Sequence, residues 1–237
     1  AGSMVLSAAG RVDHETVVRL GREAFGELPA GDSHPRESLQ YRGGDFREAK
    51  DLEQVHLVLG LEGVSYQDAD FYAVSVLSTL LGGGMSSRLF QEVREKRGLV
   101  YAIQSFHSFY ADGGLFGIYA GTGESEVAEV MPVVCAEVRK VCEAVSAEEV
   151  DRARAQLKAS LLMGLESTSS RAEQLARQLM VFGRPVPVAE IIGKVEAVDV
   201  EAVLRVARQL VASRPTVATL GRIAKVEPFE TIAARLA

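Results

Sequence analysis

Two apolar runs rich in aromatic residues, 99–110 and 114–120, flank the tripeptide Ala111-Asp112-Gly113. An Asp-Gly pair between two such runs is a strong signal for a β-hairpin, because both residues tolerate the backbone angles of a tight turn. A further strand is predicted at 55–61, where apolar residues recur with a period of two, as in a strand with one buried face. The chain must therefore contain an antiparallel sheet.

The other predicted elements are grouped along the chain, with helices filling most of the residues after the hairpin. They are strands at 4–9, 44–50 (paired with 55–61) and 216–220, and helices at 13–26, 68–81, 86–97 and 127–141, from Ser146, Ser170 and Asp199, and after residue 220. The Ser-x-x-Glu capping boxes at Ser146 and Ser170 mark two of these helix starts. Such grouping predicts an α+β fold, with an antiparallel sheet and helices layered on it.

A change of composition divides the chain early. Residues 28–43 are rich in Pro, Gly, Asp, Ser and Arg and have no apolar period, which is typical of a linker. We therefore predict three parts: residues 1–27 as the strand and helix that end one domain, 28–43 as the linker, and 44–237 as a whole domain. Residues 1–3 (Ala-Gly-Ser) resemble a cloning scar.

Charge and hydropathy exclude two classes of partner. The 237 residues carry a net charge of −6, and no segment concentrates the Lys and Arg that phosphate contacts require, so we expect no nucleic-acid binding. No apolar run reaches the roughly 18 residues of a membrane span. Cys135 and Cys142 lie seven residues apart in one predicted helix, too far for a disulfide, and we expect buried thiols and a cytoplasmic location.

The histidines offer no metal site. His14, His34, His56 and His107 show no paired ligand spacing. Glu53 and His56 have the i, i+3 spacing of a helical metal motif, but they lie on a predicted strand, where such residues point to opposite faces. We therefore expect a solvated or locally hydrogen-bonded His56, and no metal or other cofactor bound by this chain.

The run Gly82-Gly83-Gly84 follows a predicted helix and lacks the lysine of a phosphate-binding loop. We expect these glycines to supply backbone angles that other residues avoid, the serines after them to cap the helix 86–97, and Gly98 to end it. Within that helix Leu89, Phe90 and Val93 form an apolar stripe. By composition alone Arg94 is a surface arginine and Tyr101 an aromatic residue of a core.

A resemblance gives both residues a different interpretation. Residues 44–221 resemble the C-terminal half of the pitrilysin or insulinase family of zinc peptidases, particularly the bacterial relatives of mitochondrial processing peptidase. The motifs that carry it are Leu80-Leu81-Gly82-Gly83-Gly84-Met85-Ser86-Ser87-Arg88-Leu89-Phe90, Val93-Arg94-Glu95-Lys96-Arg97-Gly98-Leu99-Val100-Tyr101, and the strand pair through Gly121. Residues 4–26 resemble the last strand and helix of the family's N-terminal half.

The resemblance implies a division of labour between two α+β halves that face each other around the substrate. The family's N-terminal half binds zinc through a His-x-x-Glu-His helix and a later glutamate, and most of that half lies outside this sequence. The C-terminal half contributes an arginine and a tyrosine seven residues apart, which match Arg94 and Tyr101. The resemblance thus implies that both contact the bound peptide near its scissile carbonyl, as a guanidinium and a phenol can do.

Our main expectation is therefore the zinc-free half of a zinc metalloendopeptidase, inactive alone, with an unstructured peptide as substrate and a zinc-bearing half or subunit as partner. We also expect an exposed half to self-associate into dimers or weak oligomers. The first alternative is a non-proteolytic scaffold of the same family, such as a core subunit of a respiratory complex. The second is an unrelated α+β binding domain.

Overall fold

The computed structural model describes residues 4–29, 31 and 37–237, which group into two compact units. Unit 1 comprises residues 1–38 and 158–192, and unit 2 comprises 39–157 and 193–237. The three N-terminal residues that resemble a cloning scar, and residues 30 and 32–36 of the predicted linker, lie outside the described residues.

Unit 2 is built on a five-stranded sheet with the order β1-β5-β2-β4-β3. The strands are β1 (Gly44–Ala49), β2 (Val55–Gly63), β3 (Ala102–Phe109), β4 (Gly114–Thr122) and β5 (Thr216–Gly221). Strands β3 and β4 form the predicted hairpin, and β4 pairs antiparallel with β2. Three of the four strand pairings are antiparallel, so the predicted α+β class is confirmed.

The predicted pairing of β1 with β2 is wrong. The last strand, β5, lies between them: it pairs antiparallel with β2 and parallel with β1. No local signal in the sequence of the short strand β1 indicates which strand it pairs with. Its partner, Thr216 for Gly44, is far away in the sequence.

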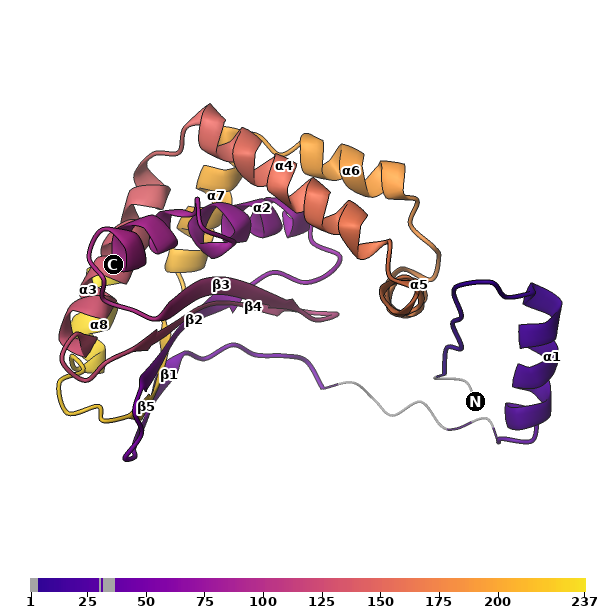
Figure 1. The fold of residues 1–237 in the computed structure, drawn as a ribbon, viewed down its shortest axis with the longest axis horizontal. Helices are drawn as coiled ribbons and strands as arrows, with labels where there is room; N and C mark the ends of the chain where they lie inside the picture. Colours follow the sequence, from indigo (N-terminus) through magenta and orange to yellow (C-terminus); the bar gives the residue numbers. More distant parts are fainter. Residues whose placement is uncertain (1–3, 30, 32–36) are drawn as a thin grey trace. The chain divides into compact units, whose positions relative to one another are not determined.

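Helices cover one face of this sheet. The helices of the chain are α1 (His14–Phe25), α2 (Phe71–Gly82), η1 (Phe90–Glu95), α3 (Val127–Glu143), α4 (Ala147–Gly164), α5 (Thr168–Phe182), α6 (Val188–Glu196), α7 (Val200–Val211) and α8 (Phe229–Leu236). Helices α2, α3 and α7 contact the sheet, with α8 packed on α3 (Figure 1). Alternate residues of each central strand, such as Leu57 and Leu59, point into this core and are almost fully buried.

Several helix starts follow the predicted caps. Asp13 caps α1 and Asp199 caps α7, each through a carboxylate that accepts a backbone N–H. At α4 the Ser146 hydroxyl accepts from Glu149 N at 3.2 Å while Glu149 accepts from Ser146 N at 2.9 Å, which is a complete capping box. The predicted start at Ser170 is wrong, because α5 begins earlier and its cap is Ser167.

The short helix η1 is a π-helix, which the sequence did not predict. Lys96 N donates to Gln91 O at 3.0 Å, an i→i+5 bond, while Gln91 N makes an ordinary i→i+4 bond to Ser87 O. Single π-turns of this kind interrupt α-helices mainly where tertiary contacts compensate their poorer geometry, and often at functional sites. The predicted stop at Gly98 is confirmed, since this residue has φ +64°.

Unit 1 has little core of its own among its described residues. Helix α1 ends at the predicted Gly26, but neither α1 nor α5 contains a fully buried residue. The strand predicted at 4–9 is wrong, because these residues pair with no strand in the part of the chain that the structure describes. A β-strand requires a hydrogen-bonded neighbour, so apolar composition alone did not produce one.

Other expectations concern single side chains and hydropathy. Both cysteines are free; Cys135 is buried and Cys142 partly buried, and burial raises the pKa of the Cys135 thiol to about 12. Among the described residues every helix is too short or too polar to cross a bilayer. His56 donates to or accepts from the Tyr119 hydroxyl at 2.8 Å, so its predicted local hydrogen bond is confirmed.

Candidate active-site segment

The segment from Leu81 to Tyr101 leads from the end of α2, through the glycines and η1, to the start of β3. Leu89 and Val93 anchor it, because both side chains are completely buried. Leu99 and Val100 follow the Gly98 turn and are buried as well. Two apolar anchors thus hold the backbone on either side of Arg94.

The three glycines are needed for space. None of them has a positive φ, so the expectation that they supply unusual backbone angles is wrong. A Cβ on Gly82 would lie 2.3 Å from the backbone nitrogen of Ser105 in β3, and one on Gly83 would lie 2.5 Å from Thr79 Cα in α2. A Cβ on Gly84 would lie 2.7 Å from the side-chain amide of Gln156 in α4.

Side chains donate to three backbone carbonyl groups of the loop from Gly83 to Arg88, which we call the glycine loop. Gln156 Nε2 donates to Gly83 O at 2.7 Å, and Ser87 Oγ donates to Gly84 O at 2.6 Å. Gln91 Nε2, from η1, donates to Met85 O at 2.7 Å. A loop whose carbonyls are bonded in this way is held in one conformation.

The start of the following helix is fixed by an ion pair. The Arg88 guanidinium donates to both carboxylate oxygens of Glu149, from Nε at 2.6 Å and from Nη2 at 2.8 Å. Nη2 also donates to Ala144 O at 2.9 Å. These side chains are about 80% buried, with relative exposures of 18% and 20%. The hydrogen bonds from Arg88 lower the pKa of Glu149 to about 2.

Arg94 lies at the end of η1 and is exposed. Its guanidinium carbon stands 4.8 Å from the centre of the Phe90 ring, a cation–π contact that orients the side chain. Glu92, the acidic neighbour on the same helix, is bound by Lys96, whose hydrogen bond lowers the pKa of the Glu92 carboxyl. Among the described residues no carboxylate pairs with Arg94.

Tyr101 lies just before β3, with its side chain 62% exposed, so the composition-based expectation of a core aromatic is wrong. Its backbone is fixed, since Tyr101 N donates to Gly121 O at 2.8 Å and Leu99 N donates to Val93 O at 3.0 Å. Within the described part of the chain the side chains of Arg94 and Tyr101 form no hydrogen bond with each other. Both are thus presented to solvent from a rigid backbone.

The resemblance points to Arg94 and Tyr101, but the sequence does not predict the side chains that contact the rest of this segment. The sequence predicts Glu149 only as half of a capping box, and no local signal marks Gln156. Arg88 and Glu149 are 61 residues apart, and no pattern in a single sequence joins them.

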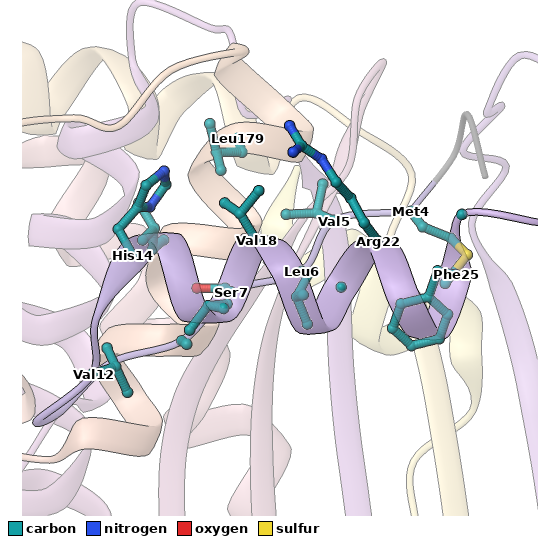
Figure 2. Close-up of a pocket in the computed structure, with 15 residues that line it drawn as sticks. Met4, Val5, Leu6, Ser7, Val12, His14, Val18, Arg22, Phe25 and Leu179 are labelled. Atoms are coloured by element: carbon teal, nitrogen blue, oxygen red, sulfur yellow. The ribbon is translucent and has the colours of Figure 1, made fainter.

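Two other features of the structure bear on where a site can lie. Nowhere in the described part of the chain do three or more His, Cys, Asp or Glu side chains gather as a metal ion requires. Unit 1 has an open cavity of about 690 Å³ between residues 4–8, α1 and α5 (Figure 2). Its lining is mainly apolar, including Leu6, Val18, Phe25 and Leu179, and it offers no cluster of groups for acid–base chemistry.

Comparison with known proteins agrees with the resemblance. The family described as "Peptidase M16 inactive domain" matches residues 1–157. Proteins named uncharacterized zinc protease are 36% identical over 222 residues in Rickettsia felis and 38% identical over 228 residues in Streptomyces coelicolor. These matches cover 93% and 92% of this chain but 54% and 50% of the relatives, so the chain spans about half their length.

One solved structure shows the same fold. A chain of complex III2 from Candida albicans, determined with Inz-5 bound, superposes with a TM-score of 0.87 over 96% of this chain and 57% of that one. The two are 20% identical in sequence, so this likeness bears on the fold alone. The family match over residues 1–157 shows that the chain belongs to the peptidase M16 family.

Proposed function

We propose that this chain is the zinc-free, C-terminal half of a zinc metalloendopeptidase. An upstream half, in the same polypeptide or in a partner subunit, supplies the zinc ion and the glutamate that activates water. Membership of the M16 family, relatives named zinc proteases and a length about half of theirs support this division. Alone, the chain is expected to bind no catalytic zinc and to cleave nothing.

Arg94 and Tyr101 are assigned to the substrate. The guanidinium donates to carbonyl groups of an unstructured peptide, and the phenol donates to the oxyanion that forms when water attacks the scissile carbonyl. The observation that carries the proposal is that both side chains are exposed on a hydrogen-bonded backbone, and that Arg94 has no carboxylate partner among the described residues. Because the backbone that carries both donors is fixed, only the two side chains have to adjust when a peptide binds.

The test requires both halves. A polypeptide that joins this chain to its upstream half is assayed for cleavage of a quenched, unstructured peptide, with added zinc and with a chelator. We expect chelator-sensitive cleavage, and a roughly 10²-fold to 10³-fold loss of turnover in Arg94→Ala or Tyr101→Phe, as when an oxyanion donor is removed.

The matched controls are Arg97→Ala and Tyr110→Phe. Arg97 belongs to the same surface segment and approaches Glu92 at 3.8 Å, and Tyr110 is an exposed tyrosine at the other end of β3. Both controls should keep activity within about twofold. Equal losses in the controls and in the Arg94 and Tyr101 variants would refute the assigned roles. Chelator-sensitive cleavage by this chain alone would refute the division into halves.

A scaffold without proteolytic activity is the alternative function. The likeness in fold to a chain of complex III2 supports it, while the presence of both Arg94 and Tyr101 favours the peptidase. The upstream reading frame separates the two, because a scaffold would lack an intact His-x-x-Glu-His. With a broken motif and no cleavage, Arg94 and Tyr101 would be structural residues.

Self-association of the isolated chain is a further part of the proposal. Unit 1 exposes several large apolar side chains, among them Leu6, Leu20, Met163 and Met180. Exposed apolar side chains grouped in one unit favour association with another protein surface. Sedimentation velocity over a hundredfold concentration range should show dimers or weak oligomers, and a single monomer boundary throughout would contradict this expectation.

A further inference from the structure

Helix α4 contacts the glycine loop at two points. Gln156 donates to Gly83 O, and Glu149 binds Arg88. Glu149 and Gln156 are seven residues apart in α4, so they lie two turns from each other on the same face of the helix. One face of α4 therefore holds both ends of the loop that runs from Gly83 to Arg88.

The loop in turn determines where η1 begins. Arg88 is in the first helical turn of the segment, and Arg94 follows six residues later, at the end of the π-helix. A π-helix is poorly stabilised by its own hydrogen bonds and depends on its surroundings. The contacts from α4, together with buried Leu89 and Val93, provide those surroundings.

We propose that Arg88, Glu149 and Gln156 are positioning residues, which hold the π-helix so that Arg94 is presented to the substrate. The proposal rests on the proposed function of Arg94. The role is geometric, since Arg88 is engaged by Glu149 and Ala144 and is not available to a ligand. A displacement of about 1 Å in a substrate-binding group can lower a rate by up to 10²-fold, so loss of this support should be visible in kinetics.

Glu149→Gln is the informative variant. Glutamine keeps the length of the side chain and can still accept from Ser146 in the capping box, so the start of α4 is preserved. The variant loses the negative charge of the carboxylate, which binds the Arg88 guanidinium through two hydrogen bonds. The matched control is Glu190→Gln in unit 1, because Glu190 also binds an arginine, Arg184, through both oxygens at 3.0 and 2.8 Å.

The kinetic test is a double-mutant cycle in the polypeptide that joins this chain to its upstream half. Glu149→Gln should lower kcat/KM on the order of tenfold, whereas Glu190→Gln should change it less than twofold. In an Arg94→Ala background the Glu149→Gln change should have almost no further effect, because the group that it positions is absent. A full tenfold loss in both backgrounds would overturn the proposal.

Hydrogen exchange supplies a readout that does not depend on activity. Amides 89–99 should exchange faster in Glu149→Gln than in the unaltered protein, while amides of the β2–β4 core should exchange at the same rate in both. In the Glu190→Gln control, exchange of amides 89–99 should not change. Unchanged exchange at 89–99 would overturn the positioning role. If Arg94→Ala itself has no effect on cleavage, the proposed function fails, and the exchange result then tests separately whether α4 holds this segment.

Discussion

Two stretches on either side of the π-helix differ in how their polar groups are used. In the stretch from Gly82 to Arg88, the carbonyls of Gly83, Gly84 and Met85 and the charge of Arg88 are bonded to neighbouring groups. In the stretch from Arg94 to Tyr101 the backbone is bonded, but the two named side chains are exposed. Groups of the first stretch hold the segment in place, and the second stretch exposes the side chains of Arg94 and Tyr101.

A family motif can therefore contain residues with separate physical tasks. Arg88 is bound by Glu149, whereas Arg94, six residues later, has no carboxylate partner among the described residues; the residue type does not distinguish the two. Substitutions of the bonded or tightly packed residues of this segment should therefore lower stability, whereas substitutions of the exposed Arg94 and Tyr101 should lower activity with little loss of stability. The following predictions test that separation, beginning with the largest expected change in the free energy of unfolding.

Gly82→Ala should cause the largest loss of stability, about 3 kcal/mol, because the new methyl group would meet the backbone nitrogen of Ser105 at 2.3 Å. Gly84→Ala is the matched control. Its methyl group would meet the end of the Gln156 side chain, which can move away at the cost of one hydrogen bond, about 1 kcal/mol. Urea unfolding of the two variants measures both values. Equal losses would mean that the close approach to β3 does not explain Gly82.

Gly98→Ala should cost about 1–2 kcal/mol for a different reason. Among the described residues, no atom outside Gly98 and its two chain neighbours lies within 4 Å of the added Cβ, but φ is +64°, which is unfavourable for an L-residue. Gly98→Asn should cost less, since asparagine tolerates this region better. Urea unfolding would contradict the explanation if the alanine variant were as stable as the glycine protein.

The two arginines provide the most direct comparison. Arg88→Ala should lower the free energy of unfolding by about 1 kcal/mol, because Glu149 and Ala144 O lose their donor in a partly buried place. Arg94→Ala should change it by less than about 0.5 kcal/mol, since it removes one exposed contact with Phe90. Thermal unfolding of both variants measures the two losses of stability. A larger loss in Arg94→Ala would mean that Arg94, and not Arg88, holds the segment in place.

The smallest predicted effect depends on pH. The folded-state pKa of Glu149 is about 2, below its ordinary value of 4.5, so the ionised carboxylate favours the folded state. This stabilisation should be complete above about pH 4.5 and should be lost as the pH falls from 4.5 toward 2. Such partly exposed pairs contribute only a few tenths of a kcal/mol to about 1 kcal/mol. The stability difference between the unaltered protein and Glu149→Gln should therefore be present at pH 7 and shrink at pH 3.

Local signals in the sequence predicted much of the fold. The Asp112-Gly113 turn, the period of two in β2, the caps Asp13 and Asp199, and the stop at Gly98 were all confirmed. Each of these signals depends on the conformational preference of a few neighbouring residues. The prediction of Arg94 and Tyr101 as site residues rests on the family resemblance. Their exposure agrees with a role in binding, and their part in the chemistry stays a prediction.

Short-range signals thus predicted most of the strands and helices and the family that the chain resembles, because backbone preferences and motifs act over short distances. They did not predict helix α6 (Val188–Glu196), and they predicted a strand at 4–9 that the structure does not contain. Three features became visible in the folded chain: β5 separates β1 from β2, η1 is a π-helix, and three glycines admit close neighbours. The ion pair between Arg88 and Glu149, 61 residues later, is likewise visible only in the folded chain. These features depend on contacts between distant segments, and the free energy of such contacts is set by packing and burial, which no local pattern encodes.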